Sequence, residues 1–119
     1  MKIAISSQGK DLDSLTDPRF GRAKYFIVIE TDTGHFTAYD NTQNVNAVQG
    51  AGIQAAQNVK DLDVVAVITG NIGPKALTSL NMAHITVYTG AMGTVRDTLE
   101  QYSLGKLKKT EKATVDGHW

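Results

Sequence analysis

The sequence predicts one α/β domain in which a five-stranded mixed sheet is flanked by helices. Its 119 residues are enough for a single domain that buries its own core. Runs rich in β-branched and aromatic residues come first, and similar runs then alternate with segments whose apolar residues recur at helical spacing. A meander followed by two right-handed βαβ crossovers fits this order, which we write βββαβαβα.

The first three strands are expected to form the meander. The β-rich run over residues 2–6 leads into a polar loop over 7–22, where glycines and an Asp-Pro pair interrupt regular structure. A nearly continuous apolar run over 25–29 and an alternating run over 36–39 flank an Asp-Thr-Gly-His turn at 32–35. Because such a turn reverses the chain, the two runs are expected to form a β-hairpin.

The rest of the domain is expected to alternate helices with strands. One run is apolar on both faces, which is typical of a central strand. The last helix opens with Thr94-Val95-Arg96-Asp97, a capping-box variant with Asp at its fourth place. The expected elements are a helix over 49–59, a strand over 64–68 (the run apolar on both faces), a helix over 74–80, a strand over 85–88 and a helix over 94–102.

Residues 1–105 are expected to form the domain and 106–119 a basic C-terminal tail. The stretch 103–119 has several lysines, few apolar residues and no periodic pattern, so we expect it to be partly frayed. The N-terminal run turns polar after five residues, and no stretch approaches the roughly 18 apolar residues of a membrane span. We therefore expect a soluble cytoplasmic protein without a membrane partner.

The composition excludes several kinds of site. A chain without cysteine has no disulfide, thiolate zinc site, cysteine-ligated iron-sulfur cluster or cysteine nucleophile. The 12 Lys and Arg residues balance 12 Asp and Glu residues, which argues against a nucleic-acid partner held by phosphate neutralisation. No catalytic constellation emerges, and His35, His84 and His118 are each expected to be surface residues rather than metal ligands.

Three glycine-rich turns each lead into an expected helix. Glycine lets the backbone approach a ligand closely, and the free N–H groups at a helix start attract anions, so the three turns together could form one anion cradle. The alternative is that glycine only serves the short connections. The turns are Gly50-Ala51-Gly52, Gly70-Asn71-Ile72-Gly73 and Gly90-Ala91-Met92-Gly93.

The loop after the first strand gathers three cations and an aromatic ring within residues 17–24. The fork-shaped donors of Arg19 and Arg22 suit an oxyanion or a sulfide-rich anion, and Phe20 could shield it from water. The alternative is that the arginines pair with Asp11, Asp13 or Asp17 on a solvated loop.

Charge is scarce over much of the chain. Residues 41–59 carry none, and from 64 to 95 only Lys75 is charged, apart from His84. Buried strands and small-residue helices would explain this scarcity, and so would a weakly hydrated face for a soft ligand or a partner protein.

Four ordered segments carry a resemblance to a known family. They are Asp-Pro-Arg-Phe-Gly-Arg-Ala at 17–23 and the segments 50–56, 69–77 and 88–95. In these segments, and over residues 2 to about 107, the chain resembles the dinitrogenase iron-molybdenum cofactor biosynthesis family.

The resemblance implies a ribonuclease-H-like sheet in the order 3-2-1-4-5, with strand two antiparallel to the rest. All strands but the second would then end at one edge, where the loop over 7–22 meets the three glycine turns, with a crevice after strands one and four. His35 and His84 fall at the opposite edge. The residues expected to bind a ligand are Arg19, Phe20, Gly21, Arg22, Gly50, Gly52, Gly70, Asn71, Gly73, Gly90 and Gly93.

The resemblance implies noncovalent binding or carriage of an anionic molybdenum-sulfur cluster, without catalysis. The short cysteine-free chain, the segment 17–23 and the Gly-Thr-Val-Arg segment at 93–96 look most like one branch of the family. That branch comes from sulfate-reducing anaerobes and holds a molybdenum-copper sulfide anion. Backbone N–H groups, Arg19 and Arg22 would surround an anion whose own sulfides complete its coordination. The predicted edge lacks Cys and His, which speaks against the iron-molybdenum cofactor itself. His84 stands where the family pattern usually has Gly.

Two other functions stay open. The chain could be an interaction module that uses its uncharged face, which in this family could mean docking to a cytoplasmic P-loop ATPase of the MinD type. It could also be a ribonuclease-H-like, metal-dependent nuclease. That chemistry needs two metal-binding carboxylates near strand ends, and the first strand offers none.

Overall fold

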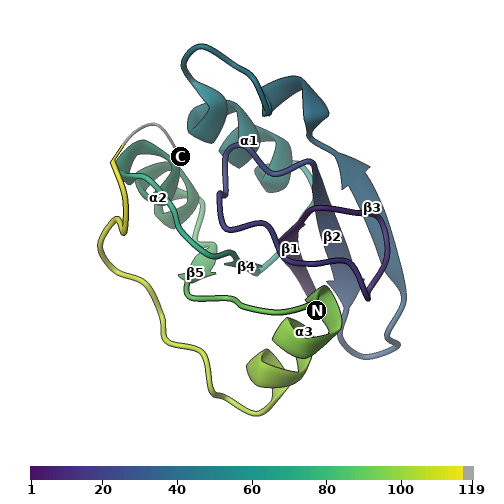
Figure 1. Cartoon of the computed structure of the whole chain (residues 1–119). Helices are drawn as coiled ribbons and strands as arrows, with labels where there is room; N and C mark the ends of the chain where they lie inside the picture. The colour runs from purple at the N-terminus through teal and green to yellow at the C-terminus, as the bar shows by residue number, and fades with distance from the viewer. Residues whose placement is uncertain (117–119) are drawn as a thin grey trace.

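The computed structural model describes residues 1–116 and contains the expected element order βββαβαβα, with one short 3-10 helix added (Figure 1). Each expected element is present, with ends that differ from the expectation by at most two residues. The elements are β1 (Lys2–Ser7), β2 (Tyr25–Glu30), β3 (Phe36–Asp40), the 3-10 helix η1 (Thr42–Asn44), α1 (Ala51–Lys60), β4 (Ala66–Ile68), α2 (Pro74–Met82), β5 (Thr86–Tyr88) and α3 (Val95–Ser103).

The five strands form one sheet in the order β3-β2-β1-β4-β5, as expected. β2 is antiparallel to β1 and β3, whereas β4 is parallel to β1 and β5. Gly34 allows the tight turn between β2 and β3, because its φ of 79° lies in the left-handed region that glycine adopts without strain. The carboxyl ends of all strands except β2 therefore share one edge of the sheet.

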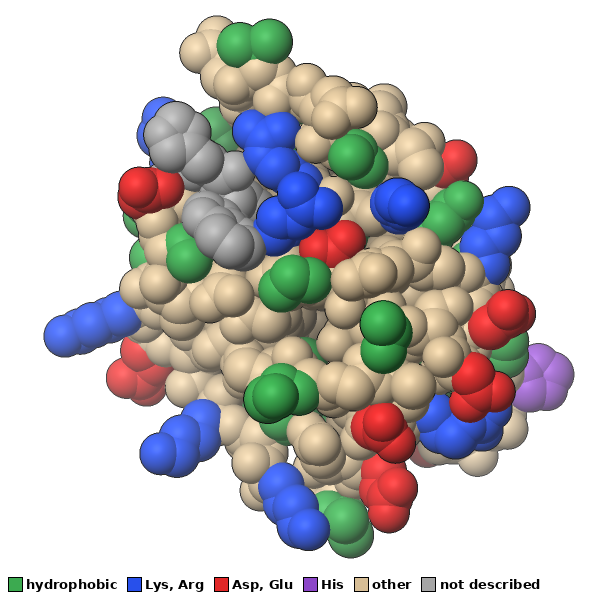
Figure 2. All heavy atoms as spheres, viewed as in Figure 1, with side chains coloured by type: hydrophobic (Ala, Val, Ile, Leu, Met, Phe, Trp, Pro, Cys, Tyr) green, Lys and Arg blue, Asp and Glu red, His purple; other side chains and the backbone are tan. Residues whose placement is uncertain are grey.

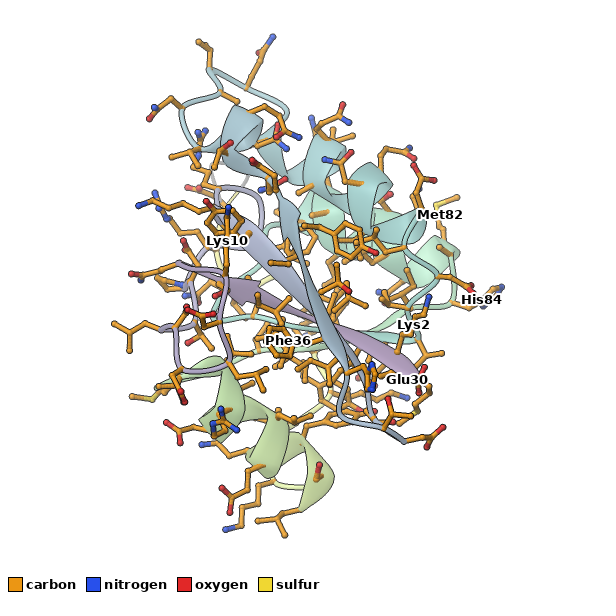
Figure 3. The ribbon with its side chains drawn as sticks, turned by 90° about the vertical axis from the view of Figure 1, so that its right-hand side faces the viewer. Lys2, Lys10, Glu30, Phe36, Met82 and His84 are labelled. Atoms are coloured by element: carbon orange, nitrogen blue, oxygen red, sulfur yellow. The ribbon has the colours of Figure 1, made fainter. Side chains whose placement is uncertain are left out.

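The sheet separates two layers of core side chains. α1 and α2 cover one face and α3 covers the other, as Figure 3 shows with the sheet between them. The alternation along β1 assigns its side chains to the two layers: Ala4 packs with α1 and α2, and Ile3 and Ile5 pack toward α3. Within residues 1–116, none of the helices is long and apolar enough to span a bilayer.

β4 is internal, as expected, but shorter than its apolar run. Asp63 has a φ of 60°, so the chain still turns just before the strand. Val65 keeps 46% of its surface exposed although its N–H donates to the Lys2 carbonyl at 2.9 Å. The run is therefore buried on both faces only over Ala66–Ile68.

The segment after α3 has fixed partners where a partly frayed tail was expected. Leu107 packs against the core layer under α3. Lys109 forms an antiparallel bridge with Tyr88, and the Thr110 N–H donates to the Val87 carbonyl at 2.7 Å. In Figure 1 the segment passes β5 and reaches α2. It thus lines the outer edge of β5; His118 lies outside the described residues.

Candidate functional site

The loop after β1 folds back over the ends of β1 and β4. The Asp17 N–H donates to the Ser6 carbonyl at 3.0 Å. The Ser6 hydroxyl donates to the Asp17 carbonyl at 2.8 Å and lies 2.8 Å from the Thr69 hydroxyl. These three residues are buried, so the loop is fixed to the strand ends by satisfied polar groups.

The turn between β4 and α2 packs directly against this loop. The Phe20 N–H donates to the Asn71 carbonyl at 3.1 Å, and Asn71 Nδ2 donates to the Pro18 carbonyl at 3.3 Å. Gly70 meets the Pro18 backbone so closely that no larger residue fits. The expected convergence of the loop with the 70–73 turn is confirmed.

The turn between β5 and α3 joins the same cluster of loops. The Thr16 N–H donates to the Gly93 carbonyl at 2.9 Å, and the Gly90 N–H donates to the Gly70 carbonyl at 3.0 Å. The loop after β1 therefore contacts both glycine turns that follow the parallel strands β4 and β5.

The starts of α1 and α2 lie side by side and carry no side-chain caps. Their N-cap residues are Gly50 and Gly73, neither of which offers an acceptor, and no acidic residue stands in either first turn. A Cβ atom on Gly52 would lie 3.3 Å from the Cβ of Ala76, so the two first turns are in contact. The first-turn N–H groups and positive dipole ends of both helices thus combine in one place.

The start of α3 is different, because its amides already have partners. Thr94 and Asp97 form the expected capping box: the Asp97 N–H donates to Thr94 Oγ1 and the Thr94 N–H donates to Asp97 Oδ2, both at 3.0 Å. The Thr94 N–H, followed by its hydroxyl, lowers the pKa of Asp97. This carboxylate makes the Gly90 to Gly93 turn a poorer anion site than the starts of α1 and α2.

Arg19 pairs with Asp17, which was one of the alternatives that the sequence left open. Its Nε lies 3.5 Å from Asp17 Oδ1, and its backbone N–H donates to the same oxygen at 2.9 Å. The carboxylate is buried, whereas 39% of the Arg19 side chain is exposed. The contact through Nε leaves the guanidinium partly exposed, and the Arg19 backbone forms a parallel bridge with Asn71.

Arg22 ties the loop to the segment that precedes α1. Its Nη1 donates to the Ala47 carbonyl at 2.7 Å and to the Val45 carbonyl at 3.3 Å. The neighbouring Gly21 carbonyl accepts a hydrogen bond of 3.3 Å from Asn41 Nδ2. Arg22 thereby brings the uncapped start of α1 toward the loop, a role that residue spacing alone does not reveal.

Phe20 belongs to the core, and its expected role as a shield over a ligand is wrong. Its side chain has no exposed surface, and its ring packs 5.2 Å from that of Phe26, centroid to centroid, on the α1 and α2 side of the sheet. A ring that anchors the loop to the sheet cannot also cover a surface ligand.

Positive side chains gather on this side of the molecule. Figure 2 shows Lys and Arg side chains over the region where the loop after β1 passes α1. Lys75 adds a cation in the first turn of α2. The buried Asp17 is the carboxylate that opposes Arg19 here, and the helix starts add no acid.

A shallow groove of about 480 Å³ runs between α1 and α2 from their starts. Ile53 and Met82, which line it, are 43% and 78% exposed. Buried strands account for part of the scarcity of charge in this half of the chain, and the groove adds a mainly apolar surface that includes the cations Lys60 and Lys75. The remaining lining residues are Lys60, Pro74, Lys75, Thr78 and Ser79.

His35, on the turn between β2 and β3, and His84 lie away from this site. Figure 3 shows Lys10, on the loop after β1, at one end of the molecule, and His84 at the other end with Lys2 and Glu30. His84 has a φ of 61°, which explains why glycine suits its position in the family pattern. Among residues 1–116, no three His, Cys, Asp or Glu side chains come together as a set that could hold a metal ion.

The family model described as dinitrogenase iron-molybdenum cofactor matches residues 1–105. This chain belongs to that family. The match covers every strand and helix of the sheet domain and ends before the segment that lines β5. The loop cluster therefore belongs to the shared domain of this cofactor family.

Two solved structures and one further relative agree with this membership. The apo form of the orange protein from Desulfovibrio gigas is 34% identical, with 96% of each chain covered and a TM-score of 0.92. A Thermotoga protein of the DUF35 family is also 34% identical, with 98% of each chain covered and a TM-score of 0.84. An uncharacterised protein of Methanocaldococcus jannaschii is 30% identical over 113 residues, which is 93% of this chain and 92% of that protein.

Proposed function

We propose that this protein binds and carries an anionic molybdenum-sulfur cluster, in particular a molybdenum-copper sulfide, and does not act as an enzyme on it. Membership of the iron-molybdenum cofactor family and the similarity to the orange protein support binding of a metal-sulfur cluster or cofactor. The cytoplasm stays the expected location.

The observation that carries the proposal is the contact between two uncapped helix starts beside an arginine-bearing loop. Gly52 and Ala76 bring the first turns of α1 and α2 together, and Arg19 lies at the adjoining turn next to Asn71. Helix amides and guanidinium groups recognise an anion without forming bonds to its metals. The cluster would keep its own sulfide ligands, which suits a chain without cysteine.

The candidate ligand residues divide into two groups under this proposal. The amides of Gly50, Gly52 and Gly73 and the side chain of Arg19 would face the anion, whereas Asn71 would hold its turn against Pro18 through its own side-chain amide. Gly21, Arg22, Gly70, Gly90 and Gly93 would hold the loops in place, because their groups meet protein partners or their positions admit no side chain.

An anaerobic titration of the apo protein with tetrathiomolybdate and copper tests the proposal. After desalting, the protein should retain stoichiometric molybdenum and copper and show new visible absorption bands. A colourless, metal-free protein would contradict the proposal.

Two matched arginine variants locate the binding site. Arg19→Gln should weaken retention roughly tenfold or more, because a charge-assisted contact is lost. Arg96→Gln is the control: Arg96 also pairs with an aspartate, Asp13, at 2.9 Å, but it stands on α3. Equal retention in the two variants would remove Arg19 from the site.

Docking to a partner protein is the second candidate function, and the groove between α1 and α2 favours it. A MinD-type P-loop ATPase is the partner that the family resemblance implies. Met82→Asp should abolish binding to a purified ATPase of this type and leave cluster retention unchanged, because Met82 lies at the exposed wall of the groove. Unchanged ATPase binding would exclude the groove as the docking surface.

A further inference from the structure

The segment over residues 107–114, which we call the strap, ends on the turn that precedes α2. Thr114 Oγ1 accepts a hydrogen bond of 2.9 Å from the Ile72 N–H, and the Thr114 N–H donates to the Ile72 carbonyl at 3.0 Å. Both backbone groups of Ile72 thus have partners on the strap. Ile72 directly precedes Gly73, the N-cap of α2.

The strap is held by hydrogen bonds more than by apolar burial. The two hydrogen bonds between Thr114 and Ile72, which we call the clasp, are not the only ones. The Thr110 N–H donates to the Val87 carbonyl at 2.7 Å, and the hydroxyls of Thr110 and Thr89 lie 2.6 Å apart. Leu107 packs against the core, whereas Lys109 and all residues from 111 to 114 are exposed. A segment with so few buried apolar contacts opens at low cost in free energy.

The Ile72 amide lies next to the donors of the proposed anion site. In a loop that enters a helix, the N–H groups just before and within the first turn act together on a bound anion. The N–H of Ile72 is therefore chemically equivalent to those of Gly73 and Lys75, but Thr114 occupies it. The hydroxyl acceptor of Thr114 stands in the place that an anion's acceptor atom would take.

We propose that the strap is a built-in competitor of the ligand: the anionic cluster displaces Thr114 from the Ile72 amide when it binds. This inference rests on the proposed function, and it assigns Ile72 as a further donor and Thr114 as the residue that controls access to it. The family match ends at residue 105, so Thr114, which would control access to the Ile72 amide, lies outside the shared domain.

Amide hydrogen exchange of the full-length apo protein, measured by NMR, tests the clasp itself. Thr114→Val removes the hydroxyl acceptor and keeps the shape of the side chain, so the Ile72 amide should exchange roughly two- to tenfold faster, as expected for one neutral hydrogen bond. Thr37→Val is the matched control, since Thr37 is an exposed threonine on β3, away from the strap. Unchanged exchange at Ile72 in Thr114→Val would overturn the clasp.

Anaerobic titration of the same proteins with tetrathiomolybdate tests the competition. Thr114→Val should bind roughly two- to tenfold more tightly than the wild type, Thr110→Val should shift affinity in the same direction, and Thr37→Val should bind as the wild type does. Saturating ligand should also speed exchange of the Thr114 amide in the wild type and leave the Thr98 amide within α3 unaffected.

The outcomes separate the two proposals. If the wild type binds and Thr114→Val binds equally or more weakly, the strap does not compete and this inference is overturned, while cluster binding stands. If the wild type binds neither tetrathiomolybdate nor its copper adduct, the proposed function fails and the competition fails with it, whatever the exchange data show of the clasp.

Discussion

Gly70 and Pro18 are in direct backbone contact: a Cβ atom built on Gly70 would stand 2.6 Å from the Cα of Pro18. This contact seats the loop after β1 on the turn between β4 and α2. It joins two segments of the cofactor-family domain that lie far apart along the chain, and it does so at the centre of the proposed site.

Gly70→Ala should therefore destabilise the protein by about 1–3 kcal/mol, because backbone atoms on both sides must move to admit a methyl group. Urea unfolding measures the change. Gly52→Ala is the control, since its Cβ would meet only the Ala76 Cβ at 3.3 Å and the substitution favours the helix. A loss in Gly52→Ala as large as that in Gly70→Ala would show that the Pro18 contact is not the cause.

Phe20→Ala should cost about 3–5 kcal/mol of unfolding free energy, as removal of a fully buried aromatic side chain does. Phe20→Leu should cost less, because it refills part of the space beside Phe26. Thermal or urea unfolding followed by circular dichroism distinguishes the two variants. Near wild-type stability in Phe20→Ala, together with a specific loss of ligand binding, would restore the role of a ligand shield.

The capping box of α3 should make the protein less stable in acid. The pKa of Asp97 is below its ordinary value in the folded state, so the carboxylate stabilises the fold at pH values above its unfolded pKa of about 3.9. This stabilisation is lost as the pH falls through the lower, folded pKa. Stability measured from pH 6 to pH 2 should thus fall less steeply in Asp97→Asn than in the wild type. An identical pH profile in both proteins would exclude a contribution from Asp97.

His84→Gly should stabilise the protein by about 0.5–1 kcal/mol. The left-handed φ of 61° costs a side-chain-bearing residue about 1–2 kcal/mol, part of which is offset by the greater freedom of glycine in the unfolded chain. Chemical denaturation compares the two proteins, with His35→Gly as the control on the β2–β3 turn. A destabilised His84→Gly would mean that the imidazole makes a favourable contact.

Local patterns in the sequence are enough to predict the sheet and the capping box. The β-rich run of β1 and the Thr94 to Asp97 spacing act over a few residues, and the structure keeps both. The loop cluster follows from the strand order in the family, because parallel strands end at one edge. These features depend on periodicity and topology, which a sequence carries directly.

Contacts between distant residues are harder to predict. A phenylalanine between two arginines reads as part of the same surface loop, and only the packed sheet reveals that Phe20 turns inward against Phe26. Thr114 and Ile72 are 42 residues apart, and no pattern in the lysine-rich tail indicates their hydrogen bonds. The contact forms only because the segment after α3 runs along β5 and reaches the turn that precedes α2.

The most direct test of the central claim is a map of amide chemical shifts as tetrathiomolybdate is added to the apo protein without oxygen. An anion at the joined starts of α1 and α2 predicts the largest shifts at the amides of Gly50, Gly52, Ile72 and Gly73, with little change at Thr94 to Asp97 or at Gly34. Largest shifts at the start of α3 or at the β2–β3 turn would contradict the claim.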